Sequence, residues 1–434
     1  MLIEYLKDFI RNKSVLILGF GREGRSTYEL LKKIQGYKEL SVADLNEITD
    51  IDEKVFCGTS YQESIGKYDI VFKSPGVVLE NLAFASKIVS QTDIMIKVFG
   101  KNIIGVTGTK GKSTTTSLIY HILKSCGKNP ILVGNIGIPA FDEAQNAKPD
   151  SLFVYELSCH QLEFATCSPH RGVLLNIYPE HLDHYGLFER YKSAKENIYR
   201  NMQAGDLLVC GKEVEPCDFD GEAITVSMTN NEADYVASES GFKNKIGVSI
   251  CEKPQCKILG VHNMYNIAVA FAICSDCGVS QEEFFDALKD FNPLPHRLEL
   301  FAEIDGVKYF DDSISTIPET AIKALDSVKN VGSILLGGMD RGIDLSGLID
   351  YLINNPVEHV ILMPDTGKII YEKLKGIYGG NIYLTEGLEE AVMVAKKVTP
   401  KGTACVLSPA AASYGFFKNF EHRGEVFKEL VLKR

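Results

Sequence analysis

Residues 102–116 read NIIGVTGTKGKSTTT, and this stretch decides the fold of the segment around it. Its first half is an apolar, β-branched run that predicts a buried strand. Its second half begins a helical pattern that continues to a stop at Gly127. A glycine-rich turn between a strand and a helix is typical of phosphate binding, because the N–H groups of the turn and of the helix N-terminus point at an anion.

Two residues at the start of the predicted helix add chemistry to this turn. In the nucleotide-binding pattern G-x-x-x-x-G-K-[ST], the lysine reaches the β- and γ-phosphates and the hydroxyl binds Mg²⁺. Lys112 and Ser113 match those positions, whereas Val106 stands where the pattern has its first glycine. The match is therefore to the shorter form G-T-x-G-K-S. A glycine-rich turn without a nucleotide is the simpler alternative, and the strand and helix around it favour the nucleotide.

The rest of the chain repeats the alternation of strands and helices. At about 150 residues a domain, 434 residues predict three domains. Strand-like runs such as SVLILGFG, GVLLNI and GSILLGG recur in all three thirds, which indicates parallel α/β sheets. We predict three α/β domains: an N-terminal Rossmann-like domain, 1–98; a central P-loop ATPase domain, 99–297; and a C-terminal Rossmann-like domain, 298–434.

Composition excludes several classes of protein. Hydrophobic residues make up 45% and charged residues 24%, which is typical of a folded globular chain. The formal net charge is −11, with no long Lys/Arg cluster, so we expect no nucleic-acid partner. No apolar run reaches the roughly 20 residues of a membrane span, and the first residues do not fit a signal peptide. We therefore expect a cytoplasmic protein without a membrane partner. A monomer is a separate expectation, because the sequence does not show the oligomeric state.

The eleven cysteines are spread along the chain, as expected for free thiols in a reducing compartment. Cys251, Cys256, Cys274 and Cys277 have a spacing that loosely resembles a zinc site. Because the last two end an apolar helical run, we favour cysteine as a small hydrophobic residue there.

The N-terminal domain carries a second phosphate-binding signal. Residues 19–24 read GFGREG, which fits G-x-G-x-x-G, and Asp44 follows 20 residues later at the end of the next predicted strand. This is the dinucleotide fingerprint in its proper context. A UDP-sugar presents the same pyrophosphate and ribose, so the motif predicts a phosphate and ribose site rather than a redox cofactor. A turn that serves packing alone is the remaining alternative.

Carboxylate and imidazole side chains follow two strands of the central domain. Glu156 ends the run LFVYE, where a buried acid would be costly without a cation, and it is the candidate metal ligand. The segment 180–184, EHLDH, follows the strand VLLNI and could bind a second metal or orient a substrate.

Taken together, these motifs resemble the Mur ligase family, most narrowly its glutamate-adding members. The resemblance covers essentially the whole chain. It rests on ordered matches at GVTGTKGKSTTT, YELSCHQLE, NIYPEHLDHY, YKSAKENIY, HNMYN, LPHRLE and SPAAASYGFFKNFEHRG. It implies an ATP-dependent ligase that forms an amide bond through an acyl phosphate, with UDP-N-acetylmuramoyl-L-alanine, glutamate and ATP as substrates.

The resemblance also implies residue roles. Lys112, Glu156, His181 and Lys195 would be catalytic, and two Mg²⁺ ions would be held by Ser113, Glu156, His181 and a carbamylated Lys195. The implied ATP-binding residues are Gly108, Thr109, Lys110, Gly111, Lys112, Ser113, Thr114, Asn263, Asn266, Arg297 and Asp312. The implied substrate-binding residues are Gly21, Arg22, Glu23, Gly24, Asp44, Ser74, Gly76, Asn135, Ser158, His181, Thr316, Arg341, Ser413 and Phe420.

One loop departs from the family pattern. Many members have N-D-S-K-x-T-N where residues 311–317 read DDSISTI, so Ile314 replaces a lysine expected near the phosphate and the amino acid. Because of this change, the sequence does not decide whether the substrate is D-glutamate or L-glutamate. Three alternatives remain: a sister ligase with another amino acid, an NAD-dependent oxidoreductase, and a catalytically silent nucleotide-binding regulator.

Overall fold

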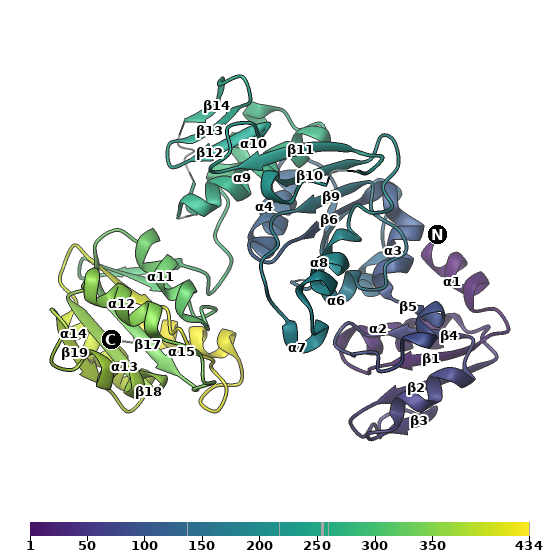
Figure 1. Ribbon diagram of the computed structural model, residues 1–434, viewed down its shortest axis with the longest axis horizontal. Helices are drawn as coiled ribbons and strands as arrows, with labels where there is room; N and C mark the ends of the chain where they lie inside the picture. The colour runs from purple at the N-terminus through teal and green to yellow at the C-terminus, as the bar shows by residue number, and fades with distance from the viewer. Residues whose placement is uncertain (137, 217, 253–255, 259, 434) are drawn as a thin grey trace. The chain divides into compact units, whose positions relative to one another are not determined.

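The computed structural model describes residues 1–434 except 137, 217, 253–255, 259 and 434. Three β-sheets flanked by helices follow one another along the chain (Figure 1), which confirms the predicted class of three α/β domains. By packing, the chain divides into two compact units, Met1–Cys256 with Met264–Asp290 and Lys257–Asn263 with Phe291–Arg434. The residue boundaries predicted for the three domains are not resolved by this division and stay a prediction.

The first sheet is parallel, with strand order β3-β2-β1-β4-β5. Its strands are β1 Ser14–Leu18, β2 Glu39–Asp44, β3 Lys54–Cys57, β4 Ile70–Lys73 and β5 Ile88–Val89. The helices of this region are α1 Leu2–Ile10, α2 Arg22–Ile34 and α3 Gln91–Phe99, with short 3-10 helices η1 Tyr61–Lys67, η2 Leu82–Lys87 and η3 Gly100–Asn102. All five residues of β1 are buried. The strand order reverses at β1, which places a ligand crevice at the carboxyl ends of β1 and β4.

The second sheet has nine strands in the order β14-β13-β12-β11-β10-β9-β6-β8-β7. They are β6 Ile103–Thr107, β7 Pro130–Gly134, β8 Leu152–Glu156, β9 Arg171–Leu174, β10 Leu207–Gly211, β11 Glu222–Ser227, β12 Tyr235–Ser238, β13 Gly241–Asn244 and β14 Ser249–Glu252. Its helices are α4 Lys112–Ser125, α5 Ala140–Ala144, α6 Cys159–Leu162, α7 Leu182–Tyr185, α8 Phe188–Glu196, η4 Lys212–Val214, α9 Val261–Asp276 and α10 Gln281–Lys289. The strands from β7 to β12 are parallel, and β12, β13 and β14 pair antiparallel as an extension. Cys274 is buried within α9, as its apolar setting predicts.

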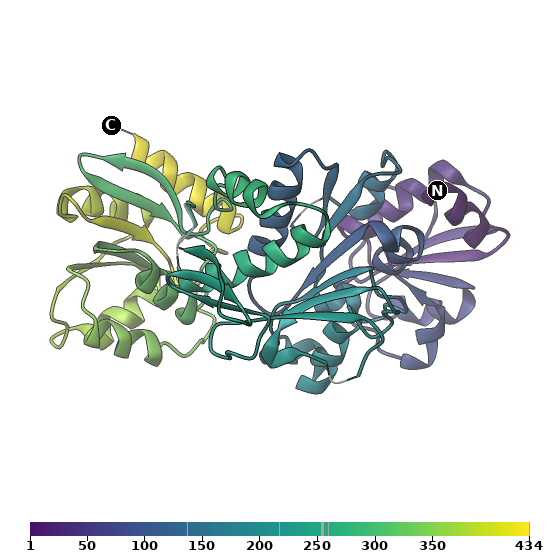
Figure 2. The ribbon, with the colours of Figure 1, turned by 90° about the horizontal axis from the view of Figure 1, so that it is seen from above.

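The first and second sheets share a continuous hydrophobic core. It runs from Leu2 through Phe99 and Phe153 to Cys210. Hydrogen bonds cross the junction as well, for example from Ser26 Oγ to Asp142 Oδ1 at 2.8 Å. In both views the purple N-terminal segment that holds the first sheet lies next to the blue and teal segment that holds the second, and in Figure 1 helices α3 and α6 lie between the strands of the two sheets (Figure 2).

The third sheet lies in the second compact unit and has the order β15-β16-β20-β17-β18-β19. Its strands are β15 Glu299–Ile304, β16 Val307–Asp311, β17 Val331–Gly338, β18 His359–Asp365, β19 Asn381–Leu384 and β20 Ala404–Leu407. The helices are α11 Pro318–Ser327, α12 Ser346–Asn354, α13 Thr366–Leu374, α14 Leu388–Val398 and α15 Phe420–Leu432. β15 pairs antiparallel with β16, and the other described strand pairs of this sheet are parallel. Among the described helices of the whole chain, none is long and apolar enough to cross a membrane.

Candidate active site

The turn between β6 and α4 has the backbone shape that the sequence predicts. Gly108 and Gly111 have φ values of +151° and +88°, which L side chains rarely adopt. A Cβ atom at Gly108 would lie 2.9 Å from Leu175 Cβ, and one at Gly111 would lie 2.8 Å from Asn266 Oδ1. Both positions are therefore closed to larger residues, and Asn266, one of the predicted nucleotide contacts, lies at the turn.

Two residues that the sequence analysis did not single out hold this turn in place. Asn176, just after β9, accepts hydrogen bonds from the backbone N–H of Lys110 at 2.8 Å and of Thr109 at 2.9 Å. Tyr191 on α8 shares a 2.7 Å hydrogen bond with the Thr109 hydroxyl. Asn176 lies at the end of a predicted strand, as Glu156 does. A polar residue at a strand end was the signal that selected Glu156, and it could also have selected Asn176. Tyr191 lies four residues before Lys195 on the same helix. At this spacing the two side chains lie on the same face of the helix.

Two lysine side chains converge on the carbonyl oxygen of Gly108. The Nζ of Lys112 donates to it at 2.9 Å and to Thr109 O at 3.0 Å, and the Nζ of Lys195 donates to it at 2.8 Å. Desolvation lowers the pKa of Lys112. Burial, together with the charge of Lys112, lowers the pKa of Lys195 to about 7. Two desolvated amines held by backbone carbonyls create a site suited to an anion.

Glu156 supplies a carboxylate at the same edge of the sheet. It pairs in register with Val106 of β6 and is fully buried. Its Oε1 accepts from Asn135 Nδ2 at 2.9 Å, whereas its Oε2 has no hydrogen-bond partner among the described residues. A buried, bare carboxylate oxygen is costly, and a cation would satisfy it. The donor set at this position therefore fits a hard divalent ion such as Mg²⁺.

His181 lies beside Tyr191 and His160, and its side chain is 46% exposed. It precedes α7 with a φ of +55°, and its ring centroid lies 6.1 Å from that of Tyr191 and 5.0 Å from that of His160. Glu180 pairs with Lys110 at 2.5 Å and approaches His181 Nε2 at 4.0 Å. Burial, with neighbouring imidazoles, lowers the pKa of His160 to about 4, so its ring is neutral near pH 7.

The first sheet builds the second predicted phosphate turn. Gly19 has a φ of +87° and its carbonyl accepts from Ser74 Oγ at 2.6 Å. The carboxylate of Asp44 accepts from the N–H of Phe20 at 2.6 Å and from that of Asn46 at 2.8 Å. Asp44 and Ser74 thus converge with Gly21–Gly24 at the carboxyl ends of β1, β2 and β4. Arg22 and Gly76 are exposed at the same edge.

Glu23 connects this turn to the second sheet. Its Oε1 accepts from Gln161 Nε2 at 2.6 Å, and Gln161 in turn forms a capping box with Ser158 at the start of α6. Burial raises the pKa of Glu23 to about 7. Through Gln161, Ser158 therefore helps to orient Glu23, which is one of the candidate residues for the UDP site.

The remaining candidates lie in the second compact unit. Asp312 is buried and accepts from Ser315 Oγ at 2.5 Å, Ser408 Oγ at 2.7 Å and Leu298 N at 3.1 Å. Burial raises its pKa to about 6, while the hydrogen bonds from Ser315 and Ser408 and, less strongly, the charge of Arg297 oppose that change. Asn263 is buried in the same unit.

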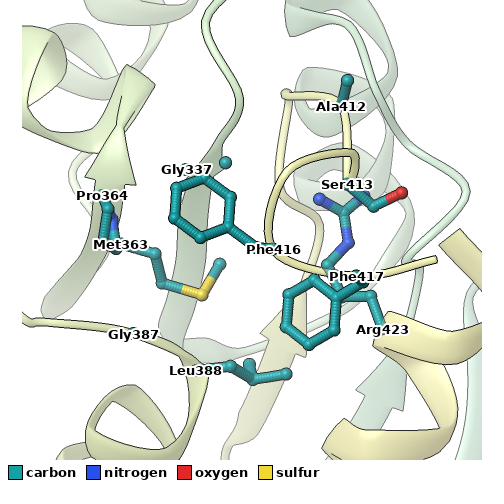
Figure 3. A pocket seen from close by; sticks show the side chains of 11 residues that line it. Gly337, Met363, Pro364, Gly387, Leu388, Ala412, Ser413, Phe416, Phe417 and Arg423 are labelled. Carbon is teal, nitrogen blue, oxygen red and sulfur yellow. The ribbon is translucent and has the colours of Figure 1, made fainter. Parts of the chain in front are cut away.

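The amino-acid candidates of this unit gather after β16, β17 and β20. Arg341 Nη2 reaches the carbonyl of Thr316 at 3.5 Å, and Phe420 O accepts from Ser313 Oγ at 2.8 Å. Ser413 lines a cavity of about 170 Å³ (Figure 3). The cavity wall is otherwise apolar apart from Arg423, with lining residues that include Met363, Leu388, Phe416 and Phe417.

Arg423 was missed by the sequence analysis, although it lies in the matched stretch NFEHRG. It is almost fully buried and donates to Ser313 Oγ, Ser313 O and Ala411 O at 2.9, 2.8 and 3.0 Å. It thereby joins the loop that contains Ile314 to the loop that contains Ser413.

Comparisons with known proteins agree with this arrangement. Residues 106–274 match the model of the Mur ligase middle domain. UDP-N-acetylmuramoylalanine–D-glutamate ligases of Pelotomaculum thermopropionicum and Clostridium acetobutylicum are 32% and 34% identical to the chain. The alignments cover 98% and 99% of this chain and 99% and 98% of those relatives.

Solved structures show the same fold. The UDP-N-acetylmuramate-alanine ligase MurC of Thermotoga maritima superposes with a TM-score of 0.62 at 22% identity, over 96% of this chain and 98% of that one. MurF ligase from Thermotoga maritima, in complex with ADP, superposes with a TM-score of 0.59 at 17% identity, over 98% of this chain and 95% of that one. With full-length relatives above 30% identity, the chain belongs to the Mur ligase family.

Proposed function

We propose that this protein is the ATP-dependent ligase that adds D-glutamate to UDP-N-acetylmuramoyl-L-alanine in peptidoglycan precursor synthesis. Family membership implies the use of ATP, and the full-length relatives carry that activity in their names. The observation that supports it most is the cluster at the β6–α4 turn, where Lys112 and Lys195 converge on Gly108 O and the negative charge of the buried Glu156 acts on both lysines. The cytoplasm, where such precursors are made, is the proposed location, and a monomer the proposed state.

The proposed reaction has two steps. The terminal carboxylate of the UDP-linked substrate attacks the γ-phosphorus of ATP, ADP leaves, and an acyl phosphate forms. The deprotonated amine of glutamate then attacks the acyl carbon, and phosphate leaves from a tetrahedral intermediate. Lys112 neutralises charge on the transferring phosphoryl group, and the turn Gly108–Thr114 binds the phosphates through its N–H groups.

We propose that Ser113, Glu156, His181 and a carbamylated Lys195 hold two Mg²⁺ ions. When bound, Mg²⁺ neutralises the charge that spreads over the phosphoryl oxygens. Asn135 orients Glu156 through its 2.9 Å hydrogen bond. The low pKa of Lys195 leaves a large fraction of neutral amine at pH 7, and only the neutral amine can add to CO₂ to give the carbamate.

The UDP part is proposed to bind at Gly21–Gly24, with Asp44, Ser74 and Gly76 beside it. Asn263, Asn266, Arg297 and Asp312 are proposed ATP contacts. Thr316, Arg341, Ser413 and Phe420 are proposed contacts of the incoming amino acid. Arg341 offers the positive charge that the lysine replaced by Ile314 would supply in other family members.

Phosphate release from ATP tests the proposal. The protein is supplied with UDP-N-acetylmuramoyl-L-alanine and, in separate reactions, D-Glu, L-Glu, D-Asp, L-Lys or Gly, with the mass of the product as the second readout. Release with D-Glu alone is the expected result. Release with L-Glu alone would identify the L-glutamate-adding variant and assign the altered specificity to the loop around Ile314. Release with another amino acid would identify a sister ligase, and ATP binding without release would identify a silent regulator.

A further inference from the structure

One carboxylate joins the first and second sheets between the two phosphate turns. Glu163 follows α6, and its Oε2 lies 3.5 Å from Lys73 Nζ and 3.4 Å from His184 Nε2. Lys73 ends β4 of the first sheet, and His184 lies on α7 beside the second. The reaction steps proposed above use none of these three side chains.

Lys73 is buried, so its positive charge needs a negatively charged partner. Its side chain is only 2% exposed, and its Nζ lies 5.2 Å from the centre of the Phe164 ring. Burial lowers the pKa of Lys73, and the negative charge of Glu163 opposes that change. Removing one member of a buried ion pair leaves the other uncompensated, so the pair favours one arrangement of its two elements.

Each end of this cluster touches a proposed substrate site. Lys73 precedes Ser74, whose hydroxyl holds the carbonyl of Gly19 in the first phosphate turn. His184 packs on His160 with ring centroids 4.4 Å apart, and His160 packs on His181 at 5.0 Å. Glu163 therefore lies between the turn proposed for UDP and the histidine proposed for the reacting end.

The proposed substrate must reach both sites at once. Its pyrophosphate would bind at the first turn, while its terminal carboxylate must approach the γ-phosphate to about 3–3.5 Å in a reactive geometry. We infer that Glu163 is a positioning residue that, through Lys73 and His184, sets the separation between the UDP-binding turn and the acyl-activating site. This inference rests on the proposed function, because it names the ligand that spans the two sites.

Glu163→Gln tests the inference by binding measurements with ligands of different length. An amide keeps the shape of the side chain and removes its charge. Because UDP touches one turn only, its Kd should stay within about twofold. The Kd of UDP-N-acetylmuramoyl-L-alanine should rise about tenfold, as expected for the loss of one charge-assisted hydrogen bond, and the KM for ATP should not change.

Asp142→Asn is the matched control. It makes the same carboxylate-to-amide change at another contact across the junction, the hydrogen bond from Ser26. It should affect UDP and the full substrate equally. Lys73→Met should weaken the full substrate more than UDP, as Glu163→Gln does, and the double variant should be no worse than Glu163→Gln, because both changes break the Lys73–Glu163 pair. If Glu163→Gln does not fold, Glu163→Asp keeps the charge, shortens the arm and allows the same comparison.

Equal losses for UDP and the full substrate, no loss for either, or additive effects in the double variant would overturn the role of Glu163. Failure of the proposed function can be distinguished from failure of the role proposed for Glu163. A wild-type protein that binds UDP-N-acetylmuramate but not its L-alanyl form would contradict the proposed substrate. The comparison of UDP with the muramoyl nucleotide would still test Glu163.

Discussion

Lys195 shows how position changes the chemistry of a side chain. By sequence it is one lysine on a helix rich in charged residues, where exposure is the usual state. In the structure its side chain is almost fully buried, donates to Gly108 O and lies 4.9 Å from the centre of the Tyr191 ring. The family resemblance identified this residue, and the structure supplies the physical reason: a desolvated amine beside a second lysine.

Lys195→Ala should abolish most of the turnover while ATP still binds. Loss of one preorganised charge in a phosphoryl-transfer site should reduce kcat by about 10²–10³. ATP affinity should change by a few-fold at most, because Lys112 and the turn remain. Titration calorimetry and phosphate release measure the two effects. Lys192→Ala, on the exposed side of the same helix, is the control, and full activity in Lys195→Ala would rule out the proposed role.

Glu23→Gln should change how stability depends on pH. Burial raises the pKa of Glu23 from 4.5 to about 7, so between these values the folded protein retains a proton that the unfolded chain has lost. The free energy of unfolding contributed by this group therefore falls as pH rises through that window, and the loss is complete above pH 7.

The variant lacks this ionisation. Its melting temperature relative to the wild type should be higher at pH 8 than at pH 5, as measured by calorimetry. Glu29→Gln, at an exposed position of the same helix, should show no such trend. A difference between Glu23→Gln and the wild type that is the same at both pH values would contradict the assignment.

At the scale of elements, strand-turn-helix order was readable from the sequence. Both glycine-rich turns lie between a strand and a helix, as GVTGTKGKS and GFGREG predict. This order can be predicted because positive φ angles, apolar runs and helix starts each depend on residues that are neighbours in the sequence. The order of strands was not readable. Nothing local shows that β6 lies between β8 and β9, and this pairing brings Glu156 beside the strand that leads into the β6–α4 turn.

Gly24→Ala should destabilise the first domain, whereas Gly21→Ala should not. A Cβ atom at Gly24 would lie 2.1 Å from the carbonyl oxygen of Gly19, so α2 would have to move away from β1. Such overpacking costs about 1–3 kcal/mol. A Cβ atom at Gly21 meets nothing within 4 Å. Urea denaturation and UDP affinity measure the two variants, and equal stability would show that α2 adjusts at no cost.

At the scale of the whole molecule, the first two sheets form one unit and the third sheet another. The predicted division into three domains came from sequence patterns alone. Those patterns mark where each sheet begins, but they do not report that Leu2 and Cys210 belong to one continuous core. A packing unit is defined by contacts between distant segments, so it can contain more than one sheet, and the predicted boundary at residue 98 stays a prediction.

UDP should therefore stabilise one unit selectively. A ligand at one hundred times its Kd adds about 2.7 kcal/mol to the unit that binds it. Hydrogen exchange followed by mass spectrometry should show slower exchange around Gly21–Gly24, β1 and β4, with peptides of Phe291–Arg434 unchanged. Inorganic phosphate at the same concentration serves as the control. Equal protection of both units would contradict the assignment of the UDP site to the first sheet.

By itself the sequence determined the class of fold, the two glycine-rich turns between a strand and a helix, and the family, because these depend on local spacing and on residue types in a fixed order. Tertiary structure decided which side chains share a site. Tyr191, Asn176 and Arg423 act through contacts with distant segments, and the environments of Lys195 and Glu23 follow from burial. Burial and long-range contacts are products of packing, so only the folded chain shows that Glu163 links Lys73 to His184.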